Sequence, residues 1–325
     1  MSFYSACVLL TVFGGFLAAF DVALLLGSAP LLRALARVSS TRRPEAILVM
    51  RFLPMTLALA VTLCVFVPAW WMYEPVETGE EASVMLVLAA AASLLPLVLG
   101  GHRALRMFMN TRDRMLGWRE RGRHAAITQT PFEVVEVNGH DVSLCVGGYL
   151  TPTIYASKEV LESLEPEELH AALAHETSHA TSRDPLRLLS MGACPDFLQV
   201  LGLDRAWRRA FSQACEFAAD VRASRGDRGV ALDLASALLK VARLNSVAPL
   251  RVDAMDIAVS SAFHSRADLE ARVQALANPD AAATRLPFSP RLWITMALAL
   301  LTLAGFSSAE RVHALTERVG RTLAP

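Results

Sequence analysis

Charged residues are scarce in this chain of 325 residues. Asp, Glu, Lys and Arg account for 19% of the sequence, against about 25% in an average soluble domain. Apolar residues account for 54%, which excludes a disordered chain, because disorder requires few apolar residues and a high net charge. The 31 basic and 31 acidic residues give no net charge, so no basic excess predicts direct binding of nucleic acid.

A cysteine pattern typical of disulfides or of a C-x-x-C site is also missing. The five cysteines are odd in number, and none of them stands in a C-x-x-C spacing. This usage favours small buried thiols in a reducing compartment over a disulfide framework.

Four long stretches have no charge or almost none. Residues 52–73, 82–101 and 292–309 are 22, 20 and 18 residues long without a charged side chain, enough to cross a hydrocarbon core of about 30 Å. The stretch 1–32 is interrupted only by Asp21, and it lacks the basic start of a cleaved signal peptide. The sequence therefore predicts an α-helical membrane protein with four transmembrane helices, three before a soluble region and one after it.

Asp21 is unusual because it lies inside a predicted span. A carboxylate within a bilayer costs about 2.5–3.5 kcal/mol on insertion scales, so such a residue is a candidate functional group. The alternative is a side chain near the interface, or one whose hydrogen bonds are satisfied by a neighbouring helix. Both interpretations remain open at this stage.

The charges of the loops predict the orientation. Bases follow the first span, acids follow the second, and bases again follow the third: Arg33, Arg37, Arg42 and Arg43; Glu74, Glu77, Glu80 and Glu81; Arg103, Arg106, Arg112, Arg114, Arg119, Arg121 and Arg123. Because basic loops stay in the cytoplasm, the amino terminus is expected outside and residues 102–291 inside. The predicted location is a bacterial inner membrane.

The chain divides into four predicted parts. Residues 1–101 form a three-helix transmembrane region, and residues 102–124 form a basic juxtamembrane linker, which is either an amphipathic helix along the inner leaflet or a plain solvated linker. Residues 125–285 form a cytoplasmic α+β domain. Residues 286–325 contain the fourth transmembrane helix and a short external tail.

The soluble domain begins with strand patterns. Runs of β-branched and aromatic residues at Phe132–Val137 and Val142–Val146 flank an Asn-Gly turn, which predicts an antiparallel hairpin. A third strand is expected at the edge of this sheet, because Pro152 cannot donate a ladder hydrogen bond. An edge strand can bind an extended peptide, so we expect substrate contacts at Thr151, Pro152, Thr153, Ile154 and Tyr155.

Helix signals dominate the rest of the domain. A proline and an acidic first turn begin a helix at Pro166, and Pro185 predicts its end at Asp184. Further helices are expected at Asp204–Ser224, Gly229–Asn245 and Asp268–Ala277.

The helix that begins at Pro166 contains an H-E-x-x-H motif. At 3.6 residues per turn, His175 and His179 lie about 40° apart on one face, where both imidazoles can bind the same zinc ion. Glu176 beside them would act as the general base that takes a proton from the attacking water. The alternative is a solvated helix with two incidental histidines, but the apolar stretch 171–174 predicts a buried setting. We therefore expect one catalytic zinc ion per chain.

The third metal ligand must come from another segment. Glu216 is the best candidate, because a carboxylate in a stretch of small apolar residues needs a partner. Asp220 shares its helix face and could accept a hydrogen bond from the second nitrogen of a zinc-bound histidine. The alternative for both acids is an exposed helix face, or pairing with Arg208, Arg209 or Arg222.

Several segments together carry a family resemblance. P-T-I-Y-A-S from Pro152, L-E-P-E-E-L from Leu164, H-E-T-S-H-A from His175, R-D-P-L from Arg183 and E-x-x-A-D from Glu216 resemble the membrane metallopeptidases of the BlaR/MecR antirepressor type. The similarity covers residues 150–225. It implies a zincin-like, gluzincin-type protease domain between spans three and four, with Glu216 as third ligand. Members of that family cleave themselves or a cytoplasmic repressor after a signal. Their external penicillin-binding domain has no counterpart in residues 307–325, so β-lactam sensing is not implied.

The chain also resembles the HtpX and CAAX-prenyl-protease group, which shares H-E-x-x-H and E-x-x-x-D. Residues 264–272 are similar to a late His-Pro…Arg segment of that group, with Ser265 in place of proline and a longer spacing. This resemblance makes His264 or Arg272 a candidate oxyanion stabiliser, against the alternative of a surface helix start.

The predicted function is that of an integral-membrane zinc metalloendopeptidase. Its substrate would be a cytoplasmic or membrane-proximal protein, and regulatory proteolysis of a transcriptional repressor or of the protease itself is preferred. The alternatives are HtpX-like quality control of membrane proteins and a non-catalytic receptor or scaffold stabilised by zinc. Glu176 favours an enzyme, because a structural zinc site closes its fourth coordination position and needs no base.

Overall fold

The computed structural model describes residues 3–73, 82–139, 142–200, 202, 204–247, 260–261, 266–278 and 314. The predicted fourth span, 292–309, and the candidate residue His264 lie outside the described residues.

Three helices near the amino terminus are long and apolar enough to cross a membrane. They are α1 (Phe3–Leu35), α2 (Arg43–Val61) with its continuation through a π-helical turn (η1, Thr62–Phe66) into α3 (Val67–Tyr73), and α4 (Val84–Arg121). They confirm the three spans predicted before the soluble domain. The protein is therefore embedded in a membrane through this end of the chain.

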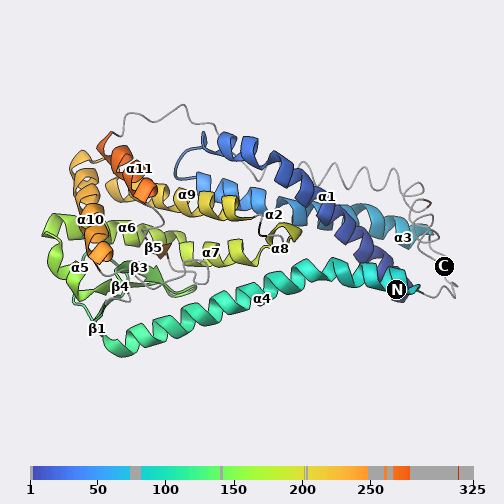
Figure 1. The fold of residues 1–325 in the computed structure, drawn as a ribbon, viewed down its shortest axis with the longest axis horizontal. Helices are drawn as coiled ribbons and strands as arrows, with labels where there is room; N and C mark the ends of the chain where they lie inside the picture. Colours follow the sequence, from blue (N-terminus) through green and yellow to red (C-terminus); the bar gives the residue numbers. More distant parts are fainter. Residues whose placement is uncertain are drawn as a thin grey trace.

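Helix α4 extends well beyond the third predicted span. It continues from the membrane region through residues 102–121 and reaches the sheet at the other end of the molecule (Figure 1). Its 38 residues correspond to a length of about 57 Å. Near its end Trp118 is buried against Tyr155, with their ring centroids 5.2 Å apart. Residues 102–121 are therefore helical and continue the third span, and a position of this segment along the inner leaflet stays a prediction.

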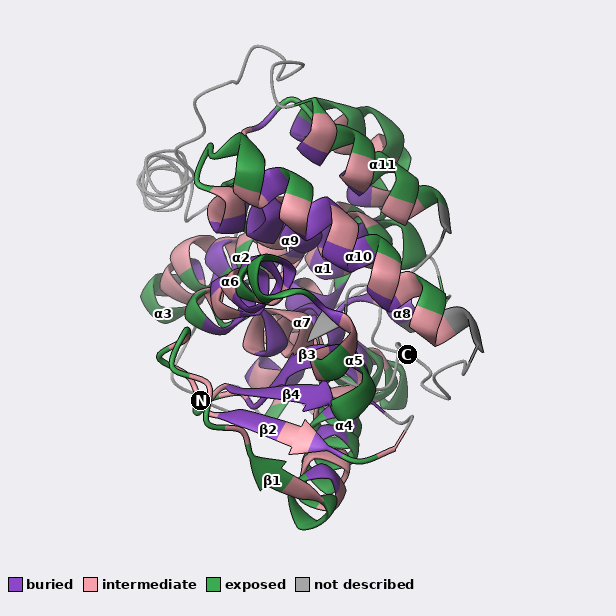
Figure 2. Cartoon of the chain, turned by 90° about the vertical axis from the view of Figure 1, so that its left-hand side faces the viewer, coloured by how far each residue is buried: buried purple, intermediate pink, exposed green. Residues whose placement is uncertain are grey.

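The strands form one mixed sheet in the order β1-β2-β4-β3-β5. Their bounds are β1 (Gly122–His124), β2 (Val134–Val137), β3 (Leu144–Gly147), β4 (Thr153–Ser157) and β5 (Ser260–Ser261). Strands β2 and β4 are parallel, whereas β1 with β2, β3 with β4, and β3 with β5 are antiparallel. Figure 2 shows that β4 is buried along its length.

The sheet corrects two predictions. The strands at Val134–Val137 and Leu144–Gly147 do not form a hairpin, because β4 lies between them and pairs with both. The segment Thr151–Tyr155 is consequently not an edge, and Pro152 precedes β4 without costing it a ladder hydrogen bond. The physical reason is burial: all five residues of β4 are buried, which favours a central position over an edge.

Helices α6 (Pro166–Ser182) and α10 (Arg228–Val247) cover one side of this sheet, and the end of α4 packs against the other. The remaining helices among the described residues are α5 (Lys158–Ser163), α7 (Asp184–Ala193), α8 (Phe197–Val200), α9 (Arg205–Ser224) and α11 (Arg266–Ala277). Apolar residues of β2, β3 and β4 form a core with α6 and α10. The predicted helices after residue 203 are confirmed to within two residues at each end. The helix predicted from Pro166 to Asp184 is wrong at its end. It stops at Ser182, because Arg183 adopts a left-handed conformation (φ 53°), and a separate helix, α7, begins at Asp184.

Asp21 lies in α1 and is 1% exposed. Its Oδ2 accepts a hydrogen bond of 2.9 Å from the backbone N–H of Phe197, the first residue of α8. One carboxylate oxygen of Asp21 is therefore hydrogen-bonded to the neighbouring helix α8, whereas Oδ1 is buried without a hydrogen-bond partner among the described residues.

Candidate metal centre

Helix α6 carries the H-E-x-x-H motif into the interior. The Glu165 side chain accepts from the first turn and Glu168 accepts from the Glu165 backbone N–H (2.9 Å), so the two form a capping box, with Pro166 at the first position. Small residues on the apolar face let the helix approach the sheet closely, and His175, Glu176 and His179 are each at most 2% exposed.

Three side chains bring ligand atoms together. His175 Nε2 lies 3.0 Å from His179 Nε2 and 3.5 Å from Glu216 Oε2, and His179 Nε2 lies 3.6 Å from Glu216 Oε1. Ligands bound tetrahedrally to zinc at 2.0–2.1 Å stand roughly 3.3 Å apart. The spacing and the His₂Glu donor set therefore fit a zinc ion, and Glu216, the predicted third ligand, lies together with the two histidines.

The second nitrogen of each histidine faces a carboxylate. His175 Nδ1 lies 3.0 Å from Asp220 Oδ1, the residue predicted for this position, and His179 Nδ1 lies 2.7 Å from Asp184 Oδ2. Such contacts fix the ring orientation and leave Nε2 free for a metal. Sequence reasoning missed Asp184 as a site residue, although Pro185 after it signalled the chain break that turns it toward His179.

Arg272 reaches the site from α11. Its Nη1 lies 2.8 Å from Glu216 Oε2, while its Nε and Nη2 donate to the two oxygens of Asp220 at 2.8 and 2.7 Å. The guanidinium is 2% exposed. Arg272 thus fixes one ligand and one histidine partner. An oxyanion role for it remains a prediction, since these hydrogen bonds of the guanidinium go to carboxylates.

The carboxylates of the site differ in their affinity for protons. Burial favours the protonated form of Glu216, but Arg272 and His179 outweigh it and lower the pKa of Glu216 well below its usual range. The pKa of Asp220 is lowered as well, because Arg272 again outweighs burial. For Glu176 burial prevails and its pKa is raised. Two carboxylates are therefore held as anions, and the third is made a stronger base.

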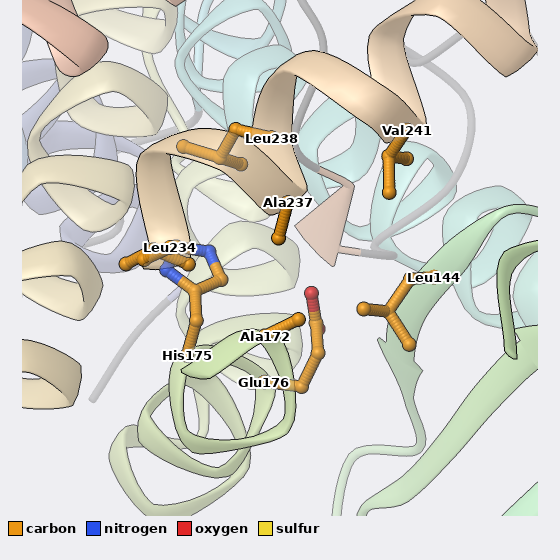
Figure 3. A pocket seen from close by; sticks show the side chains of 8 residues that line it. All are labelled: Leu144, Ala172, His175, Glu176, Leu234, Ala237, Leu238 and Val241. Atoms are coloured by element: carbon orange, nitrogen blue, oxygen red, sulfur yellow. The ribbon is translucent and has the colours of Figure 1, made fainter. Parts of the chain in front are cut away.

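Glu176 points into a pocket between α6, α10 and β3 (Figure 3). Its Oε2 is buried without a hydrogen-bond partner among the described residues. Apart from His175 and Glu176, the lining is apolar and consists of Leu144, Ala172, Leu234, Ala237, Leu238 and Val241. A buried carboxylate without a partner, beside the ligand atoms, is placed to exchange a proton with a water molecule or a substrate.

The predicted alternatives for Glu216 and Asp220 do not describe them. Both are buried, and their cationic partner is Arg272. Arg222 instead donates to Ser182 Oγ at 2.8 Å.

Residues 118–318 match the model of peptidase family M48, and the matched region includes all the residues of the metal centre. No curated protein matches the chain.

Proposed function

This chain belongs to peptidase family M48, a family of zinc-dependent metallopeptidases, and we propose that it is a membrane-embedded endopeptidase that cleaves cytoplasmic or membrane-proximal proteins. The observation that carries the proposal is the convergence of His175, His179 and Glu216 beside Glu176, whose Oε2 has no hydrogen-bond partner in the part of the chain that the structure describes. A purely structural zinc site would need no such base.

The proposed reaction uses the residues of the centre in separate roles. When bound by His175, His179 and Glu216, zinc would polarise the substrate carbonyl and lower the pKa of a water molecule. The Glu176 carboxylate takes a proton from the attacking water and passes it to the leaving amine when the C–N bond breaks. Asp184 and Asp220 hold the two imidazoles in place, and Arg272 holds Asp220 and Glu216.

The substrate backbone would lie along β3 and not along the predicted segment Thr151–Tyr155, because Thr153–Tyr155 of that segment lie between β2 and β3. Leu144 of β3 lines the pocket of Glu176. Cys145 and Val146 pair with Ser261 and Ser260 of β5. An extended substrate that uses this edge of β3 would therefore replace β5.

The proposed biological role is regulatory proteolysis, in which a cytoplasmic repressor or the protease itself is cleaved after a signal from the membrane. The resemblance to antirepressor peptidases supports this role. Quality control of membrane proteins is the second candidate, supported by the shared H-E-x-x-H and E-x-x-x-D spacing of HtpX-like proteases. In both cases the proposed location is a bacterial inner membrane, with the amino terminus outside and the protease domain in the cytoplasm.

A metal analysis tests the site. Purified protein should contain one zinc ion per chain, and this zinc should be lost in His175→Ala, His179→Ala and Glu216→Ala. Glu176→Gln should retain it, because Glu176 is not a ligand. Full zinc content in Glu216→Ala would contradict the assignment of the third ligand.

Comparison of cellular protein fragments between wild type and Glu176→Gln tests the activity. A few discrete fragments that disappear in the variant would support regulatory cleavage, whereas the accumulation of many damaged membrane proteins would support quality control. Identical fragment patterns would refute both enzymatic roles and leave the non-catalytic receptor.

A further inference from the structure

Helix α9 joins the metal centre to the membrane helices. It supplies Glu216 and Asp220, and its residues Trp207, Phe211 and Ala214 are buried in one cluster with apolar residues of α1 and α2. Trp207 Nε1 also donates a hydrogen bond of 3.0 Å to Ser28 Oγ of α1. The ligand-bearing helix is therefore seated directly on two membrane helices.

Helix α7 makes a second connection. It begins at Asp184, the partner of His179, and its other end lies against α4 and α2 (Figure 1). A Cβ at Gly100 of α4 would lie 2.6 Å from the carbonyl oxygen of Ala193, so a glycine is needed for this close approach. The turn between α7 and α8 is thus enclosed by the membrane helices.

Buried polar contacts hold this turn. Arg51 of α2 forms an ion pair with Asp196, and their side chains are 0% and 2% exposed. Asp21 of α1 accepts from the Phe197 N–H, and the Cys194 thiol donates to the Arg51 carbonyl oxygen at 3.3 Å. Each contact joins the turn to a membrane helix. Apolar side chains of similar volume would avoid the desolvation that a buried ion pair requires, so the pair is better suited to fixing a position than to adding stability.

We propose that the Arg51–Asp196 ion pair, together with Asp21, positions α7 so that Asp184 orients His179. The membrane helices then help to set the position of Asp184 beside His179, and a change in the packing of these helices alters the affinity for zinc. Asp196 follows the end of α7 at Ala193 through Cys194 and Pro195, and α7 is a single helix of ten residues, about 15 Å long, so a shift at Asp196 is carried along the helix to Asp184. Arg51, Asp21 and Asp196 are positioning residues, and this inference rests on the proposed function only in that the centre binds zinc.

A double-mutant cycle on the full-length protein tests the proposal. The dissociation constant for zinc is measured by competition with a chromophoric chelator for wild type, Arg51→Met, Asp184→Asn and the double variant. Asp184→Asn should weaken zinc binding roughly 10–100-fold, as expected for the partner of a ligand, and Arg51→Met should weaken it roughly 10-fold. In the Asp184→Asn background, Arg51→Met should have almost no further effect, because both act through His179.

The absorption spectrum of the cobalt-substituted protein supplies a second measurement. Arg51→Met should shift the ligand-field bands, whereas Lys240→Met should leave them unchanged, because Lys240 pairs with Glu168 away from α7. If Arg51→Met does not fold, the same cycle is run with Asp21→Leu. Its control is Asp21→Asn, which keeps an oxygen that can accept the hydrogen bond from the Phe197 N–H.

Two results would overturn the proposal. One is unchanged zinc affinity and cobalt spectrum in Arg51→Met. The other is an equal loss of affinity with and without Asp184→Asn, which would indicate general destabilisation. A wild-type protein that does not bind zinc would instead refute the proposed function itself.

Discussion

Replacement of Arg272 by methionine should make the stability of the protein depend strongly on zinc. Methionine keeps the apolar part of the side chain and removes the charge that faces Glu216 at 2.8 Å and Asp220 at 2.7 Å. Both carboxylates are buried, so without metal the variant leaves both of them without their guanidinium partner.

The expected magnitude follows from the cost of leaving a buried charge unpaired. Removal of one member of a buried ion pair costs about 3–5 kcal/mol. At roughly 2–4 °C per kcal/mol for a domain of 150–250 residues, this predicts a fall in Tm of about 6–20 °C for the metal-free protein. With zinc bound, a positive charge remains beside Glu216 and only Asp220 loses its partner, so the fall should be about half as large.

Thermal unfolding, followed by circular dichroism in detergent, checks this prediction with added zinc and with a chelator. The control is Arg272→Lys, which keeps the charge but cannot contact both carboxylates with one planar fork, and should lie between wild type and Arg272→Met. An equal fall in Tm with and without zinc would refute the reasoning, because it would mean that the metal does not share the partner of Glu216.

Three further predictions concern other parts of the molecule. Glu168→Gln should lower the Tm at neutral pH: burial favours protonation of Glu168, but Lys240 and Ser236 hold its pKa below the ordinary value. That stabilisation is full above the unfolded-state pKa and is lost as the pH falls through the folded-state pKa, so the difference between wild type and variant should shrink in acid. Ala237→Phe should fill the pocket beside Glu176 and raise KM for peptides with a large apolar residue next to the cleaved bond, in a peptide-cleavage assay, while zinc content stays unchanged. An alkaline phosphatase fusion after Pro325 should be active and one within 125–285 inactive; the reverse result would refute the orientation.

Local patterns were sufficient for the strands but not for their order. The runs of β-branched and aromatic residues in 132–146 marked two strands correctly, and Asn138-Gly139 suggested the hairpin between them. The chain instead makes its antiparallel pair through the next turn, where Gly148 has φ 99° and a Cβ would meet the Thr151 carbonyl oxygen at 2.4 Å. Strand order depends on which strand is buried on both sides, and that is a property of the whole domain.

In the metal centre, too, local patterns predicted some residues, and the contacts of others depend on the folded domain. Helix periodicity was sufficient to predict His175 and His179 as ligands. Glu216 and Asp220 were predicted because a carboxylate in a stretch of apolar residues needs a partner. Asp184 was missed because a continuous helix would place it about 140° from His179, and only the left-handed Arg183 brings it back. Arg272 was predicted only as a candidate oxyanion stabiliser. Its contact with Asp220 was missed, because the two residues are 52 positions apart in the sequence and no local pattern connects them.

The charges around the centre indicate why it suits a divalent cation. The buried carboxylates of Glu176, Asp184, Glu216 and Asp220 face two guanidinium groups among the described residues, that of buried Arg272 and that of partly exposed Arg187. Because histidines bind zinc in their neutral form, these groups then leave two negative charges, and a buried charge is tolerated only when it is paired. A doubly charged ion between His175, His179 and Glu216 balances them. Removal of Arg272 upsets this balance by one charge, and for that reason its effect should depend on whether the metal is bound.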